Sequence, residues 1–192
     1  GLPYQLSPVD RDGNRTPEFL ALNPMGQVPV LRLPDGTLLT ETGAMLLAVA
    51  DAAPTSGLMP PLGTSARAVA YRWLFWAATA LYETDLRYYY PERYTTDPAG
   101  ADAVQEAAHN RLDELFAMAD RILGEGPLVP GADAWALDLY LLMLTVWHPE
   151  KLAVLDRWPA LAELVGKARQ RPSVQRIWAQ HYPSAEESPW ST

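Results

Sequence analysis

The sequence predicts an α+β region followed by an all-helical region. Strand and turn signals are confined to roughly the first third of the 192 residues, where Pro and Gly separate short apolar runs. Beyond residue 64 the apolar residues instead recur every three or four positions, which is typical of amphipathic helices. Because 48% of the residues are hydrophobic, the chain can bury a substantial core.

The first predicted elements are a short extended run at residues 2–10 and a helix of about two turns. Thr16 is of a residue type that caps helices, and Pro17 suits the first turn because its missing N–H would have no partner there. The Asn-Pro pair at 23–24 ends this helix.

A β-hairpin is predicted at residues 28–40. The runs "VPVLRL" and "TLLT" flank Pro-Asp-Gly, in which each residue suits its place in a turn. Pro29 cannot donate a ladder hydrogen bond, so it marks the entrance of the first strand.

A helix begins directly after the hairpin, with Thr40 or Thr42 as the capping hydroxyl, and ends before Pro54. A linker rich in Pro and Gly separates it from the helical region. The predicted first domain, linker and second domain are residues 1–54, 55–63 and 64–192.

Five helices are predicted in the second domain. The first starts at Thr64 or Ser65 and carries apolar residues at steps of three and four. It and the next helix have the amphipathic pattern of antiparallel partners, whereas the third is apolar on nearly every side and indicates a buried helix. The last four cover residues 102–123, 136–147, 159–170 and 173–181.

Charge and composition argue against several function classes. With 15 basic and 23 acidic residues the formal net charge is −8, which disfavours nucleic acid and anionic membranes as partners. The chain has no cysteine, so it offers no disulfide or thiolate site, and a reducing compartment is favoured. The longest apolar run, 136–147, is too short to span a bilayer. The histidines are too widely spaced to predict a metal site: His109, His148 and His181.

Three features together resemble the glutathione S-transferase family, of bacterial type, over nearly the whole chain. "NPMGQVPVL" at 23–31 resembles the family's Asn-Pro-x-Gly-x-Val-Pro-x-Leu segment, and "LLTETGAML" at 38–46 resembles its Leu-x-Glu-Ser/Thr-x-Ala-Ile segment. A linker then leads to a helical domain. Each motif is weak alone, but their spacing around a hairpin makes the combination specific. The resemblance implies a thioredoxin-like first domain and a helical-bundle second domain.

The resemblance also implies glutathione contacts. In the family the proline of the first segment is cis, and the backbone of the preceding residue, here Val28, pairs with the cysteinyl part of glutathione. Glu41 then pairs with the ammonium group, and Thr42, at a positive helix end, meets the γ-glutamyl carboxylate. Gln27 is a candidate for the glycyl carboxylate. The alternatives are an ordinary strand-edge Pro29, an ordinary helix start and a solvated glutamine.

The chain departs from the family at its N-terminus. Family members have a strand and a helix before the segment that matches residues 1–10, and the catalytic Tyr, Ser or Cys stands at the end of that strand. By resemblance, the sheet here is incomplete because its first β-α pair is missing. No position in the chain takes the catalytic role, so the catalytic residue is unknown, and weak glutathione binding with little conjugation is expected.

A second departure lies at the start of the helix at 136–147. The family has Ser/Thr-x-x-Asp there as a local cap, and Trp135 stands in place of the hydroxyl. A carboxylate in an apolar helix needs partners, so Asp138 is expected to accept backbone N–H bonds, with Asp133 as a substitute cap. A structural role for Asp138 is favoured over a catalytic one.

The stretch "LRYYYPERYTTD" at 86–97 falls, by resemblance, over the mouth of the glutathione cleft, where electrophilic co-substrates bind. Its candidates for that pocket are Tyr88, Tyr89, Arg93 and Tyr94. The alternative is a helix end packed by aromatic rings whose hydroxyls reach water.

The resemblance implies a cytoplasmic homodimer that uses glutathione as co-substrate, without a metal, on a small hydrophobic electrophile. Such a protein lowers the pKa of the thiol so that the thiolate attacks at neutral pH. Two alternatives stay open: a non-catalytic dimeric binding or scaffold protein, and a glutathione-dependent disulfide reductase or lyase. In the dimer the small residues Gly43, Ala66 and Ala70 permit close approach of the partner.

Overall fold

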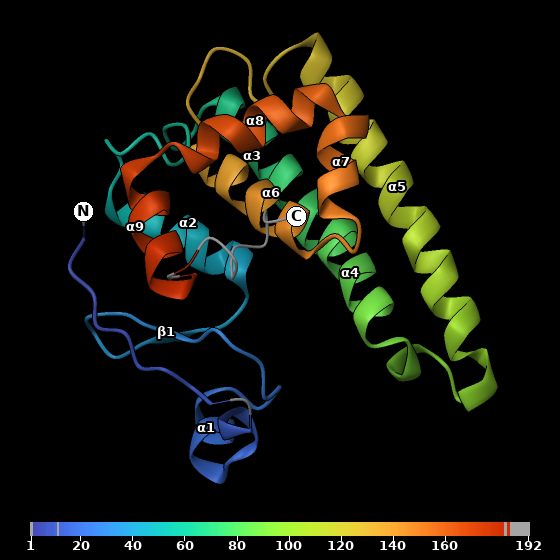
Figure 1. Cartoon of the computed structure of the whole chain (residues 1–192). Coiled ribbons are helices and arrows are strands. Elements are labelled where there is room, and N and C mark those ends of the chain that lie inside the picture. The colour runs from blue at the N-terminus through green and yellow to red at the C-terminus, as the bar shows by residue number, and fades with distance from the viewer. Residues whose placement is uncertain (1, 11, 183, 185–192) are drawn as a thin grey trace. The chain divides into compact units, whose positions relative to one another are not determined.

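The computed structural model describes residues 2–10, 12–182 and 184 (Figure 1). The chain divides into two compact units, residues 1–58 and 59–192. Within the described residues, the first unit contains two short strands and two α-helices, and the second is helical. The predicted order, an α+β region followed by an all-helical region, is confirmed.

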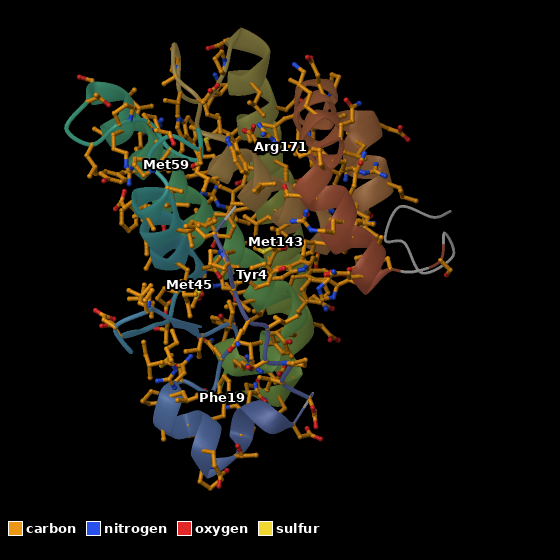
Figure 2. The ribbon with its side chains drawn as sticks, turned by 90° about the vertical axis from the view of Figure 1, so that its left-hand side faces the viewer. Tyr4, Phe19, Met45, Met59, Met143 and Arg171 are labelled. Atoms are coloured by element: carbon orange, nitrogen blue, oxygen red, sulfur yellow. The ribbon has the colours of Figure 1, made fainter. Side chains whose placement is uncertain are left out.

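Helix α1 (Pro17–Leu22) forms where the sequence predicts it. Thr16 Oγ1 accepts a hydrogen bond from the Phe19 N–H at 3.3 Å, and Pro17 occupies the first turn. A 3₁₀ turn, η1 (Gly13–Arg15), precedes the cap. Phe19, labelled in Figure 2, is the buried side chain of this short helix.

The predicted hairpin is also confirmed. Strands β1 (Leu31–Arg32) and β2 (Leu38–Leu39) pair antiparallel, with Leu31 opposite Leu39. In the turn between them, Asp35 Oδ1 accepts a hydrogen bond from the Thr37 N–H at 2.9 Å. This bond lowers the pKa of the Asp35 carboxyl.

The extended run predicted at residues 2–10 is not a strand. In the described part of the chain it forms no ladder with β1 or β2. Its apolar side chains Leu2, Tyr4 and Leu6 are all exposed. An extended segment becomes a strand only where a neighbouring strand takes its hydrogen bonds, and the apolar pattern alone does not supply that neighbour.

Helix α2 (Thr42–Ala52) follows β2, but the prediction that Thr40 or Thr42 caps it is wrong. The N-cap residue is Glu41, which adopts a φ of +65° and makes no side-chain cap hydrogen bond. Because the chain turns at Glu41, the Thr40 hydroxyl lies 3.4 Å from the Glu41 carboxylate and donates to it instead. Met45, labelled in Figure 2, is buried on this helix.

A nearly continuous helix begins the second unit. It consists of α3 (Ser65–Trp76), a π turn η2 (Ala77–Leu81) and α4 (Tyr82–Tyr89). Thr64 caps α3 as predicted, since its hydroxyl accepts a hydrogen bond from the Arg67 N–H at 3.1 Å. The π turn was not predicted. It adds a residue to one turn and so rotates the following side chains by about 100° relative to an unbroken helix.

Among the helices of the second unit, α6 contacts α3, α4, α7 and α8, whereas α5 contacts α4 and α8. Figure 1 shows α6 beside α8, and these two helices are in contact, as are α4 and α5. Most of the side chains of α6 are buried, as the apolar sequence predicts. Four of these helices were predicted, and the short α7 was not. Their bounds are α5 (Ala101–Glu125), α6 (Trp135–Trp147), α7 (Lys151–Arg157), α8 (Pro159–Arg169) and α9 (Pro172–His181).

Two 3₁₀ turns connect α4 to α5: η3 (Pro91–Tyr94) and η4 (Pro98–Gly100). The largest fully buried side chains of the unit include Phe116, Leu74, Leu81, Leu112, Leu141 and Leu144. None of the helices in the described residues combines the length and the apolar character that crossing a membrane requires.

Candidate functional site

The predicted site residues fall into two groups, one in each unit. The predicted glutathione contacts Gln27, Val28, Pro29, Glu41 and Thr42 belong to the first unit. The predicted co-substrate residues belong to the second: Tyr88, Tyr89, Arg93 and Tyr94.

A buried asparagine shapes the loop before the first strand. Asn23 is only 3% exposed, and its side chain spans the loop. Its Nδ2 donates to the Gln27 carbonyl at 2.7 Å, and its Oδ1 accepts from the Met25 N–H at 3.0 Å. Both ends of the amide are therefore satisfied, and the backbone that leads into Val28 is fixed.

Gly26 is required at the tip of this loop. It adopts a φ of +62°, and a Cβ there would lie 2.7 Å from Arg15 Nη1. The Gly26 carbonyl accepts a hydrogen bond from Asn14 Nδ2 at 2.8 Å. A side chain at this position would meet backbone strain, and its Cβ would lie only 3.1 Å from the Asn14 carbonyl oxygen, which explains the glycine of the motif.

The residues after this loop lie at the surface of their unit. Gln27, Val28 and Pro29 are exposed, Val28 by 54%. The Val28-Pro29 peptide bond is cis, which confirms the prediction made from the motif.

The second predicted contact region is the start of α2. Glu41 is exposed and Thr42 is half-buried. No side chain caps the helix, so its first N–H groups receive no side-chain acceptor from Glu41. An uncapped helix start presents N–H donors and a partial positive charge, and beside the Glu41 carboxylate it offers complementary groups for an anion and an ammonium.

In the second unit, Tyr88 and Tyr89 lie together at the end of α4. Their rings meet edge to face with centroids 5.0 Å apart. The Tyr89 hydroxyl donates a hydrogen bond to the carbonyl of Trp147, the last residue of α6. Burial raises the pKa of the Tyr89 hydroxyl, and the charges of Asp85 and Tyr88 raise it further.

The structure does not bring Arg93 and Tyr94 onto these two tyrosines. Arg93 stacks on Tyr90, with its guanidinium carbon 3.8 Å from the ring centroid, and Arg87 lies over Tyr94 at 5.3 Å. Burial raises the pKa of Tyr94, as does its hydrogen bond to a glutamate of α4. The four predicted residues are therefore distributed over three contacting pairs of side chains. Two members of these pairs, Arg87 and Tyr90, were missed by sequence reasoning.

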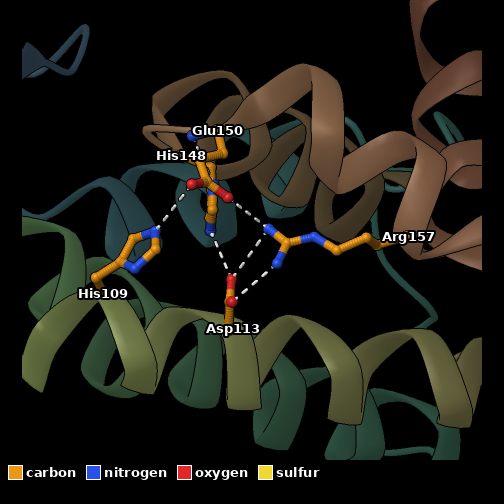
Figure 3. Close-up of polar contacts among 5 residues, drawn as sticks. All are labelled: His109, Asp113, His148, Glu150 and Arg157. Carbon is orange, nitrogen blue, oxygen red and sulfur yellow. Dashed lines mark hydrogen bonds and ion pairs between the residues drawn. The ribbon is translucent and has the colours of Figure 1, made fainter.

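Sequence reasoning also missed a polar cluster that joins α5 to the end of α6 and to α7 (Figure 3). His148 Nδ1 accepts a hydrogen bond from the Glu150 N–H at 3.0 Å. Its Nε2 lies 3.4 Å from Asp113 Oδ1. Arg157 bridges the two carboxylates, Asp113 and Glu150, at 2.9 Å each, while His109 faces Glu150 at 3.8 Å.

This cluster has the properties of a structural tie. Burial lowers the pKa of His148 to about 4, against the opposing effect of Asp113, so the imidazole is neutral near pH 7. The Arg157 guanidinium lies between the Asp113 and Glu150 carboxylates, in the position that a bound metal cation would need. Across the part of the chain that the structure describes, no three His, Asp or Glu side chains are arranged to hold a metal ion.

The start of α6 differs from the predicted cap. Its N-cap residue is Ala134, and no side chain makes a cap hydrogen bond, so the prediction of Asp133 as a substitute cap is wrong. Burial raises the pKa of Asp138, and the positive charge of Arg171 opposes that rise. Arg171, labelled in Figure 2, also stacks over Trp135 at 4.3 Å. The guanidinium group on the Trp135 ring thus supplies a positive charge near Asp138.

A further residue missed by the sequence is Asp85 on α4. It is only 1% exposed, and neither carboxylate oxygen has a hydrogen-bond partner among the described residues. Burial raises its pKa to about 8. The sequence signal that could have found it is its spacing from Tyr82 and Tyr89, which puts all three on one face of α4.

The chain is similar to known proteins over most of its length. The family model described as "Glutathione S-transferase, N-terminal domain" matches residues 1–52. A protein of Escherichia coli K12 described as the uncharacterized GST-like protein YncG is 29% identical over 182 residues, which are 92% of this chain and 85% of that protein. Glutathione S-transferase GST-4.5 of Xanthomonas campestris pv. campestris is 30% identical over 146 residues, 76% of this chain and 71% of that one.

A solved structure agrees with these similarities. The glutathione transferase homologue from Sulfitobacter, crystallised with bound glutathione, matches with a TM-score of 0.83 at 28% identity. The match covers 93% of this chain and 86% of that one.

Proposed function

Because the chain belongs to the glutathione S-transferase family, we propose that it binds glutathione on its first unit and uses it on a small electrophile. Its fold, a thioredoxin-like domain followed by a helical domain, is that of the family. The observation that carries the proposal is the loop at 23–29 in the first unit, whose backbone is fixed by Asn23 and in which the residue Val28 is exposed.

The proposed contacts follow the family residue by residue. The Val28 backbone pairs with the cysteinyl part of glutathione, and Gln27 reaches the glycyl carboxylate. At the start of α2, the N–H groups and the Thr42 hydroxyl bind the γ-glutamyl carboxylate, and Glu41 binds the ammonium group. The uncapped helix start supports this assignment, because the N–H groups there carry a partial positive charge that favours an anion.

These contacts hold the peptide rather than the reacting sulfur. They are equally strong in the ground state and in the transition state, so they promote binding without accelerating thiolate attack. Activation of the thiol needs a donor beside the sulfur, which these contacts do not supply.

The electrophile is proposed to bind at the end of α4, where Tyr88 and Tyr89 present a paired aromatic surface. Tyr89 is 47% exposed and Tyr90 40%, so ring surface is available there for stacking. Arg93 on Tyr90 adds a cation to this surface.

The proposed assembly is a cytoplasmic homodimer. Gly43 and Ala66 are half-buried and remain candidates for close approach of a partner. Ala70 is fully buried in the described chain, so it does not face a partner.

Calorimetric titration of the 192-residue chain with reduced glutathione tests the binding proposal. We expect Glu41→Gln to weaken binding about tenfold or more, because a hydrogen bond to a charged group contributes about 1.5–3 kcal/mol. Glu18→Gln, which changes another exposed carboxylate of the same unit, is the matched control and should bind like the parent chain. Equal dissociation constants for the parent and Glu41→Gln would show that Glu41 does not contact glutathione.

A substrate panel separates the three family functions. Turnover of 1-chloro-2,4-dinitrobenzene with glutathione identifies a transferase, and glutathione-dependent reduction of a mixed disulfide identifies a reductase. Glutathione binding without turnover of either substrate identifies a binding protein.

A further inference from the structure

Asp85 is a buried acid that the proposed function does not use. Its side chain is almost fully enclosed in the second unit, at 1% exposure, and both carboxylate oxygens lack a hydrogen-bond partner among the described residues. A buried carboxylate without donors is strongly disfavoured, so the group is expected to hold a proton. Burial raises the pKa of Asp85 to about 8, in agreement with this argument.

The position of Asp85 on α4 links it to the end of α6. Tyr82 and Tyr89 lie three residues before it and four after it, on the same helix face. Both tyrosines contact Trp147: the Tyr82 ring lies 5.7 Å from the Trp147 ring, and the Tyr89 hydroxyl donates to the Trp147 carbonyl. Asp85 is thus placed between two side chains that meet the same residue of α6.

Helix geometry places Tyr89 as a donor that can respond to a charge on Asp85. Long side chains on a helix lean toward its N-terminus, over the residue four positions earlier, which for Tyr89 is Asp85. The two groups are electrostatically coupled, since the charge of Asp85 raises the pKa of the Tyr89 hydroxyl. The Tyr89 hydroxyl carries a single proton, so it donates to one acceptor at a time.

Other charged groups do not take this place. Of the elements packed against α4, η2 has no titratable side chain, and those of α5, α6 and η3, such as His109, Tyr140 and Arg93, do not shift the pKa of Asp85. Burial is the one cause of that shift.

We propose that Asp85 is a positioning residue for Tyr89, because its protonation state selects the acceptor of the Tyr89 hydroxyl. With Asp85 neutral, the hydroxyl donates to the Trp147 carbonyl and ties the end of α4 to the end of α6. When Asp85 loses its proton to solvent, the carboxylate becomes the stronger acceptor, because hydrogen bonds to charged acceptors are shorter and stronger. The hydroxyl then turns to Asp85, and the tie to Trp147 is released.

The consequence for the co-substrate surface rests on the proposed function. If Tyr89 contacts the electrophile, the protonation state of Asp85, one helical turn earlier, sets the orientation of the Tyr89 hydroxyl on that surface. That orientation then changes above neutral pH. The coupling between Asp85, Tyr89 and Trp147 itself holds with or without a ligand.

The coupling is tested by ¹³C NMR of the whole chain without glutathione, between pH 5.5 and 9.5. One sample carries label at the tyrosine Cζ, and the other at the aspartate carboxyl carbon. The loss of one signal in Tyr89→Phe and in Asp85→Asn assigns the two resonances. We expect the Tyr89 signal to shift with the same midpoint as Asp85, and we expect that shift to be absent in Asp85→Asn.

A second variant keeps the test decisive if Asp85→Asn does not fold. In Tyr89→Phe the ionised carboxylate loses its donor, so the midpoint of Asp85 should rise. Tyr90→Phe, which removes a neighbouring exposed hydroxyl, should leave the midpoint unchanged. An Asp85 midpoint unaffected by Tyr89→Phe, or a Tyr89 signal that does not follow Asp85, would overturn the proposal. Because no glutathione or electrophile is present, that result would leave the proposed function standing.

Discussion

At the scale of single residues, the hydrogen-bond partners of a buried polar side chain determine how much its burial costs in folding free energy. Asn23 is buried, but its amide donates to the Gln27 carbonyl and accepts from the Met25 N–H, so its burial costs little. Asp85 is buried without a partner. Asn23 therefore fixes a loop at any pH, whereas Asp85 makes the stability of the second unit depend on pH.

Asp85→Asn should remove a pH dependence from the free energy of unfolding. The pKa of Asp85 is raised to about 8 in the folded chain, whereas an unfolded aspartate titrates near pH ~4. The folded state thus holds one more proton between these values. The contribution of Asp85 to the free energy of unfolding is complete below pH ~4. It is lost as the pH rises toward the folded-state pKa of Asp85, by up to about 1.4 kcal/mol per pH unit.

Urea unfolding at pH 5, 6, 7, 8 and 9 measures this difference. The stability of the parent chain relative to Asp85→Asn should fall from pH 5 to 8 and level off above it. Parallel stability curves for the two proteins would show that Asp85 has an ordinary pKa.

The backbone of the loop at 23–29 was predictable from sequence, and the burial of Asp85 was not, for physical reasons. The loop at 23–29 depends on local requirements, a glycine with positive φ and an asparagine bonded within four residues, which a motif records. Asp85 stands between Glu83 and Arg87, a polar neighbourhood that predicts an exposed face. The unpredicted π turn at Ala77–Leu81 precedes Asp85. It rotates the helix face that carries Asp85 relative to the face expected for an unbroken helix.

At the scale of elements, length and position decided which helices the sequence predicted. The helices α5, α6 and α8 have long apolar stripes or runs, and their ends were predicted to within a few residues. The seven-residue α7 is too short for a periodic pattern, since isolated short helices are marginal. It is held by tertiary contacts: Val154 is fully buried, and Arg157 pairs with Asp113 of α5.

Arg157→Met should loosen α7 from α5. Arg157 contacts both Asp113 and Glu150 at 2.9 Å, but its side chain is 39% exposed, so we expect a loss of about 1 kcal/mol or less. The pKa of His148, lowered mainly by burial and partly by Arg157, should rise in the variant.

Urea unfolding and the ¹H NMR titration of His148 provide the two readouts. Arg111→Met removes an exposed ion pair with Glu114 on α5 and is the matched control, which should change the stability by no more than a few tenths of a kcal/mol. Equal losses in the two variants, with an unchanged pKa of His148, would contradict a tie between α5 and α7.

At the scale of the whole molecule, the change of architecture along the chain was predictable because it follows periodicity. Apolar spacing changes from strand-like to helical along the chain, and a turn-rich segment lies between the two regions. The side-chain partners that lie far apart in the sequence were not predictable. Arg157 and Asp113 are 44 positions apart, and Tyr89 and Trp147 are 58 apart. Sequence spacing says nothing about such pairs until the helices are packed.

The chain is predicted to form a homodimer in which α3 faces the partner. The family implies that the helix starting at Ser65 lies across a two-fold axis, and Phe75 on this helix is 60% exposed. If Phe75 lies in that interface, its burial contributes on the order of 2 kcal/mol per copy. Sedimentation at micromolar concentration should give twice the 21.2 kDa chain mass. Phe75→Glu should sediment as a monomer, because a charge would be buried without a partner, and Leu152→Glu, an exposed leucine on α7, should stay dimeric. A monomeric parent chain would contradict the dimer, and a dimeric Phe75→Glu would place the interface on another face.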